Sequence, residues 1–355
     1  MGSSETIRRN FSVKNIFMNT NVKFFPYIPY ESRLIPLNQR FVRDYCVREI
    51  CNISNKTKCF SSLCGQSFTG PENIITSPFN ENFCTYLTGL IEGDGSIIVP
   101  KDLFSKLSNP SVQICFHLKD LPLALAVQKE VKCGKLHRKK GVNAYLYTIN
   151  NREGLLRLSF CIYRYMRTPK IYDLWKLIDW LNNQSTNIHI PKKGIDESDL
   201  LGNGWLSGFI EAYGHFSVRA TLKASKYAIE CKMEIVQSMT DHNTFSKKDF
   251  LEKIAYILHS TVKRTLQRRA KPEYRVRTVS VKGNLVCKEY LEKYPLFGSK
   301  WLDFQDWCIV LQFFEKKRHK NKVFYNDIVQ IKERMNNNRK NYRWDHLSNF
   351  YHLEK

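Results

Sequence analysis

A ten-residue segment occurs twice in this chain of 355 residues. It reads LTGLIEGDGS over Leu87–Ser96 and LSGFIEAYGH over Leu206–His215. A weaker correspondence follows in the same order, between Lys170–Leu174 and Lys300–Phe304, each placed just before another tryptophan. Similar segments that keep their order indicate two similar units in tandem. The chain is therefore predicted to fold as two halves related by a pseudo-two-fold axis.

The hydrophobic pattern gives each half the same order of elements. Alternating apolar residues predict strands at 96–99, 112–118 and 144–149 in the first half, and at 215–220, 229–236 and 274–281 in the second. Helical periodicity predicts helices at 121–131, 171–181, 250–258 and 301–314. Together with a helix over each repeated segment, this is an α+β pattern of helix, strand pair, helix, strand pair, helix.

The polar stretch around Pro191 separates the two halves, so we expect halves at 81–190 and 204–355 with a linker at 191–203. Residues 1–80 are expected to form a basic, partly disordered extension, because they have ten Lys and Arg against five Asp and Glu. Its first thirty residues contain one acidic residue, Glu5, which is typical of a mitochondrial transit peptide and predicts the mitochondrial matrix. A disordered basic arm is the alternative.

The charge balance favours a polyanionic partner. The chain has 56 Lys and Arg against 33 Asp and Glu, a net charge of +23. So large an excess repels itself, and a polyanion relieves that repulsion. Nucleic acid is the first expectation and an anionic membrane surface the second. No stretch of about 18 uncharged apolar residues occurs, which excludes a conventional membrane-spanning helix.

Small residues in the repeated segment predict how the halves meet. Gly89 and Gly93 lie four residues apart on one helical face, and Gly208 and Ala212 are their counterparts. A glycine inside a helix costs about 1 kcal/mol relative to alanine. Close packing of two helix backbones offsets that cost. We therefore expect the two segments to form helices that pair at the axis.

The carboxylate at the end of the first repeated segment is the best candidate for chemistry. Asp94 precedes Gly95, and glycine commonly ends helices, so Asp94 is expected at a helix C-terminus. There its negative charge faces the negative end of the helix dipole. A divalent metal would compensate for this unfavourable placement. Two such carboxylates at the axis could hold metals against two phosphodiesters and cut both strands of a duplex.

These residues resemble the LAGLIDADG family of intron-encoded homing endonucleases and RNA maturases. The resemblance covers about residues 82–350. Four further segments look like the mitochondrial group I intron branch of the family: Phe116–Asp120, Arg138–Asn143, Met166–Lys170 and Pro295–Gly298. The resemblance to the family implies two halves, each with the element order αββαββα. It also implies that the motif helices form the interface and that the strands lie on the DNA major groove. It also implies that the last acid of each motif binds Mg²⁺, which makes Asp94 the first metal ligand.

The second motif departs from the family pattern. Tyr213 stands where the second metal-binding acid belongs. A neutral phenol is a poor ligand for Mg²⁺, which prefers carboxylate, carbonyl and water oxygens. Glu211 lies two residues earlier and points elsewhere on a helix, so Glu92 and Glu211 are expected to serve packing or capping. This pattern predicts impaired cleavage.

Basic residues supply the remaining candidates. Lys139 and Lys140 in the first half, and Arg268 and Lys271 in the second, could stabilise a pentavalent phosphate or only position the backbone. The strands and their ends offer groove-reading candidates: Lys101, His117, Lys119, Arg138, Arg219, Lys223, Lys226, Lys232, Arg275 and Arg277. Arg275 and Arg277 alternate, so they share one face of a strand.

Three functions remain open from the sequence. The first is a group I intron RNA maturase or splicing cofactor that binds nucleic acid with impaired DNA cleavage. The second is a Mg²⁺-dependent homing endonuclease or nickase that uses Asp94. The third is a recruited structural protein associated with the ribosome. In each, the chain acts as a monomer on intron RNA or a long duplex, with a splicing protein or the ribosome as a further partner.

Overall fold

The computed structural model describes residues 79–100, 109–184, 189–223, 226–265 and 272–351. These all belong to one compact unit, residues 75–355. The predicted basic extension before Phe79 and the candidates Lys101, Arg268 and Lys271 lie outside the described residues. No helix in the described part of the chain is long and apolar enough to cross a membrane.

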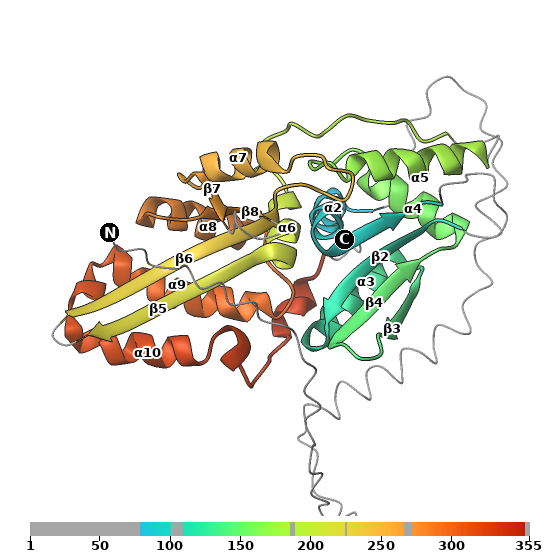
Figure 1. Cartoon of the computed structure of the whole chain (residues 1–355). Coiled ribbons are helices and arrows are strands. Elements are labelled where there is room, and N and C mark those ends of the chain that lie inside the picture. The colour runs from blue at the N-terminus through green and yellow to red at the C-terminus, as the bar shows by residue number, and fades with distance from the viewer. Residues whose placement is uncertain (1–78, 101–108, 185–188, 224–225, 266–271, 352–355) are drawn as a thin grey trace, which may run out of the picture. The chain divides into compact units, whose positions relative to one another are not determined.

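The first half contains a four-stranded antiparallel sheet in the order β1-β2-β4-β3 (Figure 1). Its strands are β1 (Gly95–Ile98), β2 (Ser111–His117), β3 (Lys135–Arg138) and β4 (Ala144–Ile149). Its helices are α2 (Glu81–Asp94), α3 (Leu121–Val131), α4 (Arg152–Ile162) and α5 (Ile171–Asn183). A short 3₁₀ helix, η1 (Leu118–Asp120), links β2 to α3.

The second half repeats this topology in the order β5-β6-β8-β7. Its strands are β5 (Gly214–Lys223), β6 (Lys226–Ser238), β7 (Val262–Thr265) and β8 (Glu273–Arg277). Its helices are α6 (Trp205–Tyr213), α7 (Lys248–Ile257), α8 (Val281–Lys293), α9 (Lys300–Glu315) and α10 (Tyr325–Glu333). The predicted α+β fold with two pseudo-symmetric halves is confirmed.

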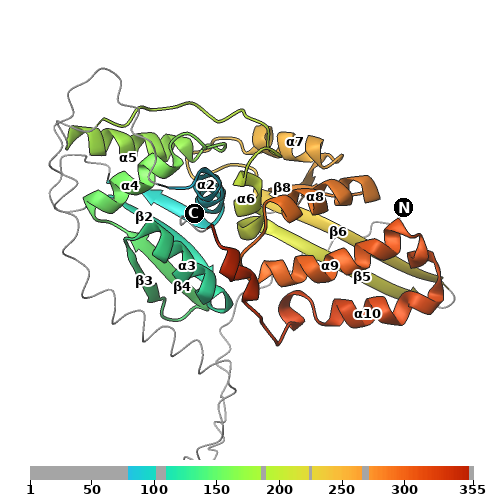
Figure 2. The ribbon, with the colours of Figure 1, turned by 180° about the vertical axis from the view of Figure 1, so that it is seen from behind.

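Each sheet buries one face and exposes the other. In β2 the side chains of Val112, Ile114 and Phe116 are buried, whereas Cys115 and His117 between and beyond them are exposed. In the second half α9 and α10 cover the buried face: they lie behind β5 and β6 in Figure 1 and in front of them in Figure 2. The other face of each sheet is left open to a ligand.

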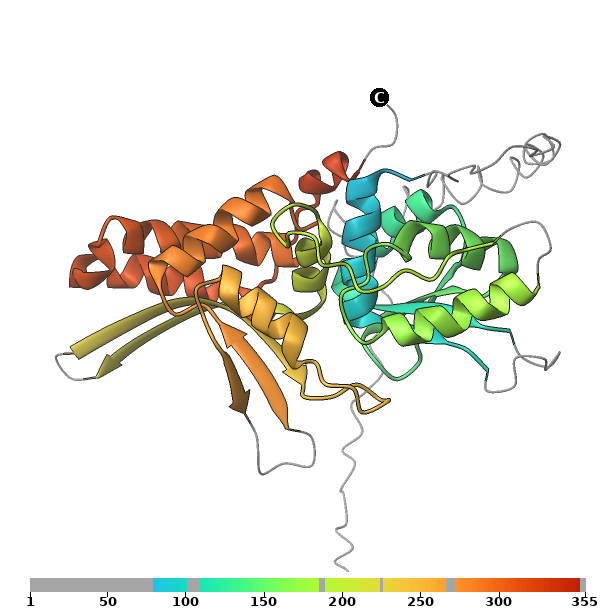
Figure 3. The same cartoon turned by 90° about the horizontal axis from the view of Figure 1, so that it is seen from above.

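The two halves meet along α2 and α6, which lie side by side (Figure 3). A side chain on Gly89 would overlap the backbone of Trp205, and one on Gly208 would overlap the backbone of Tyr86. One turn further on, a side chain on Gly93 would overlap Ala212. The small residues thus allow backbone-to-backbone packing, as predicted from their spacing.

The structure adds elements that the pattern did not predict, among them α4, α8 and α10. The strand predicted to run to Val281 ends at Arg277, because Ser280 caps α8 by accepting a hydrogen bond from the Gly283 N–H at 3.1 Å. The segment Pro191–Asn203, predicted as a linker, contains no helix or strand.

The chain's last described segment, residues 336–351, runs from the second half to the first, and we call it the C-terminal strap. Arg339 binds Asp303 and Asp306 of α9 at 2.9 and 2.6 Å. Further along, the Phe350 ring packs edge-on against Phe83 of α2 and against Phe297. The strap therefore fastens one half to the other.

Candidate nucleic-acid interface and metal site

The two motif helices end side by side at Asp94 and Tyr213, their last residues. The glycines that follow, Gly95 and Gly214, have extended backbones rather than the left-handed geometry common after helices. Glycine is needed here for space: a side chain on Gly95 would overlap the carbonyl of Ile91. The backbone can therefore turn straight from helix into strand and place both end residues at the axis.

A partly buried lysine neutralises the negative end of each motif helix. Lys170 Nζ donates to the carbonyl oxygens of Ile91 and Glu92 at 2.8 and 2.9 Å. Lys300 Nζ donates to those of Ile210 and Glu211 at 2.9 and 2.7 Å. A divalent metal was expected to compensate the helix dipole at Asp94, and the structure shows that a lysine of the chain already does so.

These lysines were missed as site residues, although the sequence carried a signal for them. Lys170 and Lys300 open the second pair of repeated segments, so they occupy equivalent places in the two halves. Burial lowers the pKa of Lys170 to about 8. Burial also lowers the pKa of Lys300, against the opposing effect of Glu211 and Asp94.

Glu92 and Glu211 face the interface and are held by hydrogen bonds. Glu92 accepts from the indole N–H of Trp205, on the other half, at 2.6 Å and from the Thr168 backbone N–H at 2.7 Å. Glu211 accepts from the backbone N–H groups of Phe297 and Gly298 at 2.7 and 3.0 Å. Both carboxylates lie where packing or capping was expected, and neither replaces a metal-binding acid at a helix end.

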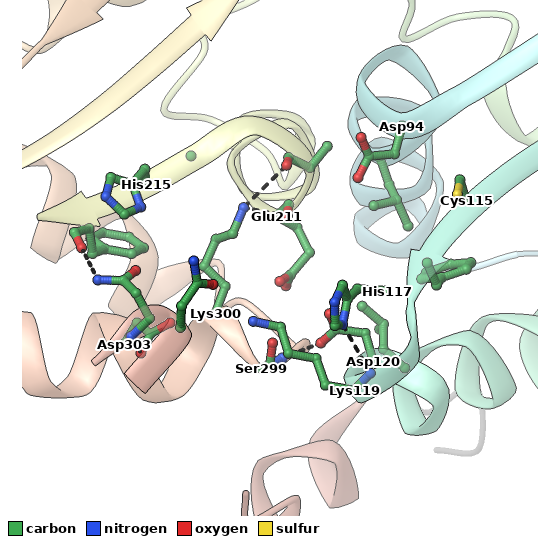
Figure 4. Close-up of a pocket in the computed structure, with 18 residues that line it drawn as sticks. Asp94, Cys115, His117, Lys119, Asp120, Glu211, His215, Ser299, Lys300 and Asp303 are labelled. Atoms are coloured by element: carbon green, nitrogen blue, oxygen red, sulfur yellow. Dashed lines mark hydrogen bonds between the residues drawn. The ribbon is translucent and has the colours of Figure 1, made fainter. Parts of the chain in front are cut away.

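A cavity of about 350 Å³ opens between the halves beside Asp94 (Figure 4). The charged and polar residues that line it include Asp94, His117, Lys119, Asp120, Glu211, His215, Lys300 and Asp303. Asp120 of the first half accepts a hydrogen bond from the Ser299 N–H of the second half at 2.6 Å, and so links the two halves at the cavity. Burial raises the pKa of Asp94, while Lys300 and Lys170 oppose the rise. Of the four carboxylates that line the cavity, Asp120, Glu211 and Asp303 accept hydrogen bonds from other parts of the chain, which leaves Asp94 for a ligand.

The equivalent helix end in the second half is chemically different. Tyr213 is 37% exposed and does not line this cavity. Burial and the Asp94 charge raise the pKa of its phenol, and a contact with the buried Gln237 opposes the rise. Gln237 in turn accepts a hydrogen bond from Lys247 Nζ at 3.0 Å. The phenol is therefore neutral near pH 7. Its hydrogen-bonded neighbours, Gln237 and Lys247, include no carboxylate.

The ends of the two motif helices offer one carboxylate, Asp94, to a divalent cation. Among the described residues, no group of three or more His, Cys, Asp and Glu could hold a metal. Mg²⁺ accepts one or two carboxylates with phosphate and water oxygens completing its octahedron. Asp94 can supply that carboxylate at the cavity, whereas Tyr213 cannot.

The structure separates the predicted phosphate contacts of the first half. His117 and Lys119 line the cavity, but Lys119 lies in η1 rather than in a strand. Lys139 and Lys140 are exposed on the turn after β3 and do not line the cavity. Arg138 is the last residue of β3 and pairs with Tyr145. It lies on the same face of the strand as Leu136, and β3 is an edge strand, so Arg138 lies at the edge of the sheet and not on its open face.

In the second half, four predicted groove readers share the open face of the sheet. The register aligns Arg219 with Glu230, Ser217 with Lys232, and Glu234 with Arg277. Arg275 lies two residues before Arg277 and so points the same way. Lys223 and Lys226 pair at the far end of β5 and β6.

Two of these basic residues are already paired with acids on the same face. Arg277 binds Glu234 at 2.6 Å, and Lys232 binds Glu230 at 3.0 Å. The sequence pattern did not predict that acids accompany the basic residues. The open face is therefore a mixed surface with donors and acceptors, which suits contacts to base edges as well as to phosphates.

Comparison with known proteins agrees with the geometry. A model of the LAGLIDADG endonuclease family matches residues 87–181 and 206–311, which contain both motifs. The chain is 30% identical over 307 residues to the intron-encoded DNA endonuclease aI3 of Saccharomyces cerevisiae, covering 75% of this chain and 72% of that protein. It is 27% identical over 165 residues to the intron-encoded RNA maturase bI4 of the same yeast, covering 46% and 23%.

Solved structures share the same fold. The homing endonuclease I-GzeII, in complex with its DNA target, superposes with a TM-score of 0.57 at 19% identity, covering 74% of this chain and all of that one. I-SmaMI, bound to uncleaved DNA in the presence of calcium ions, gives 0.54 at 19% identity, covering 71% and 98%. With both motifs matched, their helices paired and the fold shared, the chain belongs to the LAGLIDADG endonuclease family.

Proposed function

We propose that this chain is a nucleic-acid-binding protein with impaired DNA cleavage, and most concretely a group I intron RNA maturase that acts in the mitochondrial matrix. The observation that carries the proposal is the unequal pair at the ends of the motif helices. Asp94 offers a carboxylate beside the cavity, whereas Tyr213 offers a neutral phenol. The remaining architecture of both halves is intact.

Binding would use the open faces of the two sheets. These faces carry Arg219, Arg275 and His117 beside acceptors such as Glu230 and Glu234. The net charge of +23 supplies long-range attraction to phosphates. The internal pseudo-two-fold symmetry gives one chain two such faces, so a monomer suffices.

Cleavage, where it persists, would depend on the Asp94 side alone. A Mg²⁺ ion bound there would act as a Lewis acid on a phosphodiester oxygen. Asp94 would hold the ion, and Lys300 would place a positive charge beside the same cavity. The Tyr213 side lacks an anionic ligand, so a concerted cut of both strands is not supported.

An exchange at Tyr213 tests the impairment. We expect the unaltered chain to show little or no Mg²⁺-dependent cleavage of a library of duplex DNA, and Tyr213→Asp to raise cleavage by about tenfold or more. Tyr213→Phe is the matched control, since it keeps the ring but adds no carboxylate. Asp94→Asn in the Tyr213→Asp background should remove the gain. Equal double-strand cleavage by the unaltered chain would overturn the proposed impairment.

The RNA assignment has its own test. At moderate salt, the unaltered chain should bind a folded group I intron transcript more tightly than a duplex DNA of equal length. A steep dependence of affinity on salt is expected for both ligands, because many phosphates are contacted. Tighter binding to duplex DNA would instead favour the endonuclease described next.

The second candidate is an active homing endonuclease or nickase. It is favoured by the yeast relative aI3, whose name describes a DNA endonuclease and whose match extends over 75% of this chain. The complete first motif and the cavity beside Asp94 agree with it. A product nicked in one strand only, lost in Asp94→Asn, would establish this function.

A further inference from the structure

A second basic surface lies away from the open sheet faces. The connection between α9 and α10 contains the sequence KKRHKNK over residues 316–322, which we call the basic loop. Its five cationic side chains are all exposed: Lys316, Lys317, Arg318, Lys320 and Lys322. The loop contains no acidic residue. Ion pairs of the second half use other basic residues, and none within the described part of the chain uses these five.

Aromatic side chains pack around the basic loop. The His319 ring stacks on Phe314 with centroids 4.0 Å apart, and His319 Nδ1 lies 3.2 Å from the Phe313 carbonyl oxygen. Phe313 packs against Phe324 at 5.6 Å, and the Arg318 guanidinium lies over the same Phe324 ring. These contacts anchor the loop through His319 and Arg318, and an anchored loop backbone loses less entropy on binding than a free one.

The fold itself does not require these charges. In the first half, the helix equivalent to α9 is α5, which ends at Asn183. The sequence after it reads Gln184, Ser185, Thr186 and Asn187, without a charge. The two halves share one topology, so the charge of the basic loop is an addition to the second half alone.

The basic loop lies at the distal end of the second half, on the helix side of the sheet. Tyr325 at the start of α10 contacts Tyr227 near the start of β6, with ring centroids 6.0 Å apart. Figures 1 and 3 show the α9–α10 connection at the same end as the tips of β5 and β6. β5 has ten residues, so at about 3.3 Å per residue this end is about 30 Å from the motif helices.

This position favours folded RNA over a straight duplex. DNA on the open sheet face would have to bend around the end of the sheet to reach the helix side, and its persistence length is about 150 base pairs. A folded RNA has several helices that point in different directions, so one can lie on the sheet while another meets the basic loop. We propose that the basic loop binds the phosphates of a second RNA helix, outside the sheet faces; this rests on the proposed RNA function.

The experiment compares two variants of the full chain with equal charge. The first changes the five basic-loop cations to glutamine. The control changes five exposed lysines from elsewhere on the described surface: Lys129, Lys132, Lys193, Lys282 and Lys293. Thermal unfolding checks that both variants fold, which is expected because His319, Phe313, Phe314 and Phe324 are retained.

Affinity is measured against a folded group I intron transcript and a 30-base-pair duplex DNA over a range of salt. The basic-loop variant should bind the transcript about tenfold or more weakly than the control variant, and its salt slope should fall by about three. Its affinity for the duplex should equal that of the control. Equal loss of RNA affinity in both variants, or a loop-specific loss confined to DNA, would overturn the inference.

The proposed function can fail independently. If the unaltered chain binds duplex DNA more tightly than the transcript, the maturase proposal fails. At low salt a chain of charge +23 still binds RNA, so the comparison of the two variants on RNA remains decisive for the basic loop.

Discussion

At the residue scale, two partly buried lysines compensate the ends of the motif helices, and Lys170 does so for the helix that ends in a carboxylate. Lys170 and Lys300 each donate to successive carbonyl oxygens of a motif helix. They offset the unfavourable helix dipole, for which the sequence had suggested a metal as one cationic partner. The case for a metal at Asp94 therefore rests on family membership and on the available carboxylate, and not on the dipole.

The burial of Lys170 predicts a pH effect on stability. Its pKa falls from 10.5 to about 8 in the folded protein. Between these values the unfolded chain binds more protons at this residue, so Lys170 makes the free energy of unfolding rise with pH. This contribution is at most about 1.4 kcal/mol per pH unit.

Lys170→Met should remove that contribution. Denaturant unfolding of the unaltered chain and the variant at several pH values from 8 to 10 measures the difference between their slopes. We expect the variant to gain less stability, or lose more, as the pH rises. Lys176→Met, on the exposed side of α5, which begins just after Lys170, is the control and should leave the slope unchanged. Equal slopes for Lys170→Met and the unaltered chain would contradict the assignment.

At the element scale, the motif helices pack so closely that only glycine fits at the crossing. The overlaps predicted for side chains on Gly89 and Gly208 are with backbone atoms, which cannot move aside as a flexible side chain can. The tight contact also fixes the positions of Asp94 and Tyr213 one turn further along.

Gly89→Ala should therefore be strongly destabilising. Insertion of a methyl group into a well-packed contact costs about 1–3 kcal/mol and more where the backbone must shift, so we expect a loss of about 3 kcal/mol. Gly194→Ala is the matched control, because a side chain there meets open space. Denaturant unfolding gives both values. A loss below about 1 kcal/mol for Gly89→Ala would show that the helices can separate at little cost.

At the scale of the whole molecule, the C-terminal strap adds a second connection between the halves. It is anchored on α9 by Arg339 and reaches the first half at Phe350, which is 4% exposed. Nothing in the internal repeat predicts this connection, since it follows the last repeated segment.

Phe350→Ala should lower the stability of the folded unit that the two halves form together. Removal of a buried phenylalanine costs about 3–5 kcal/mol, and we expect one cooperative unfolding transition at a lower denaturant concentration. Val323→Ala, at a side chain that is 75% exposed, should change stability by less than about 0.5 kcal/mol. Two separate transitions in the Phe350→Ala variant would show that the strap, and not the motif helices, couples the halves.

The sequence by itself determined the repeat, the element order, the glycine contact and the unequal acids, because each depends on local periodicity or on residue identity. Tertiary structure decided the rest. Lys170 and Lys300 become caps only when α5 and α9 dock against the motif helices. Lys139 and Lys140 lie on an exposed turn and do not line the cavity beside Asp94. Strand register pairs Arg277 with Glu234. Such contacts join residues far apart in the chain, and no local pattern encodes their distances.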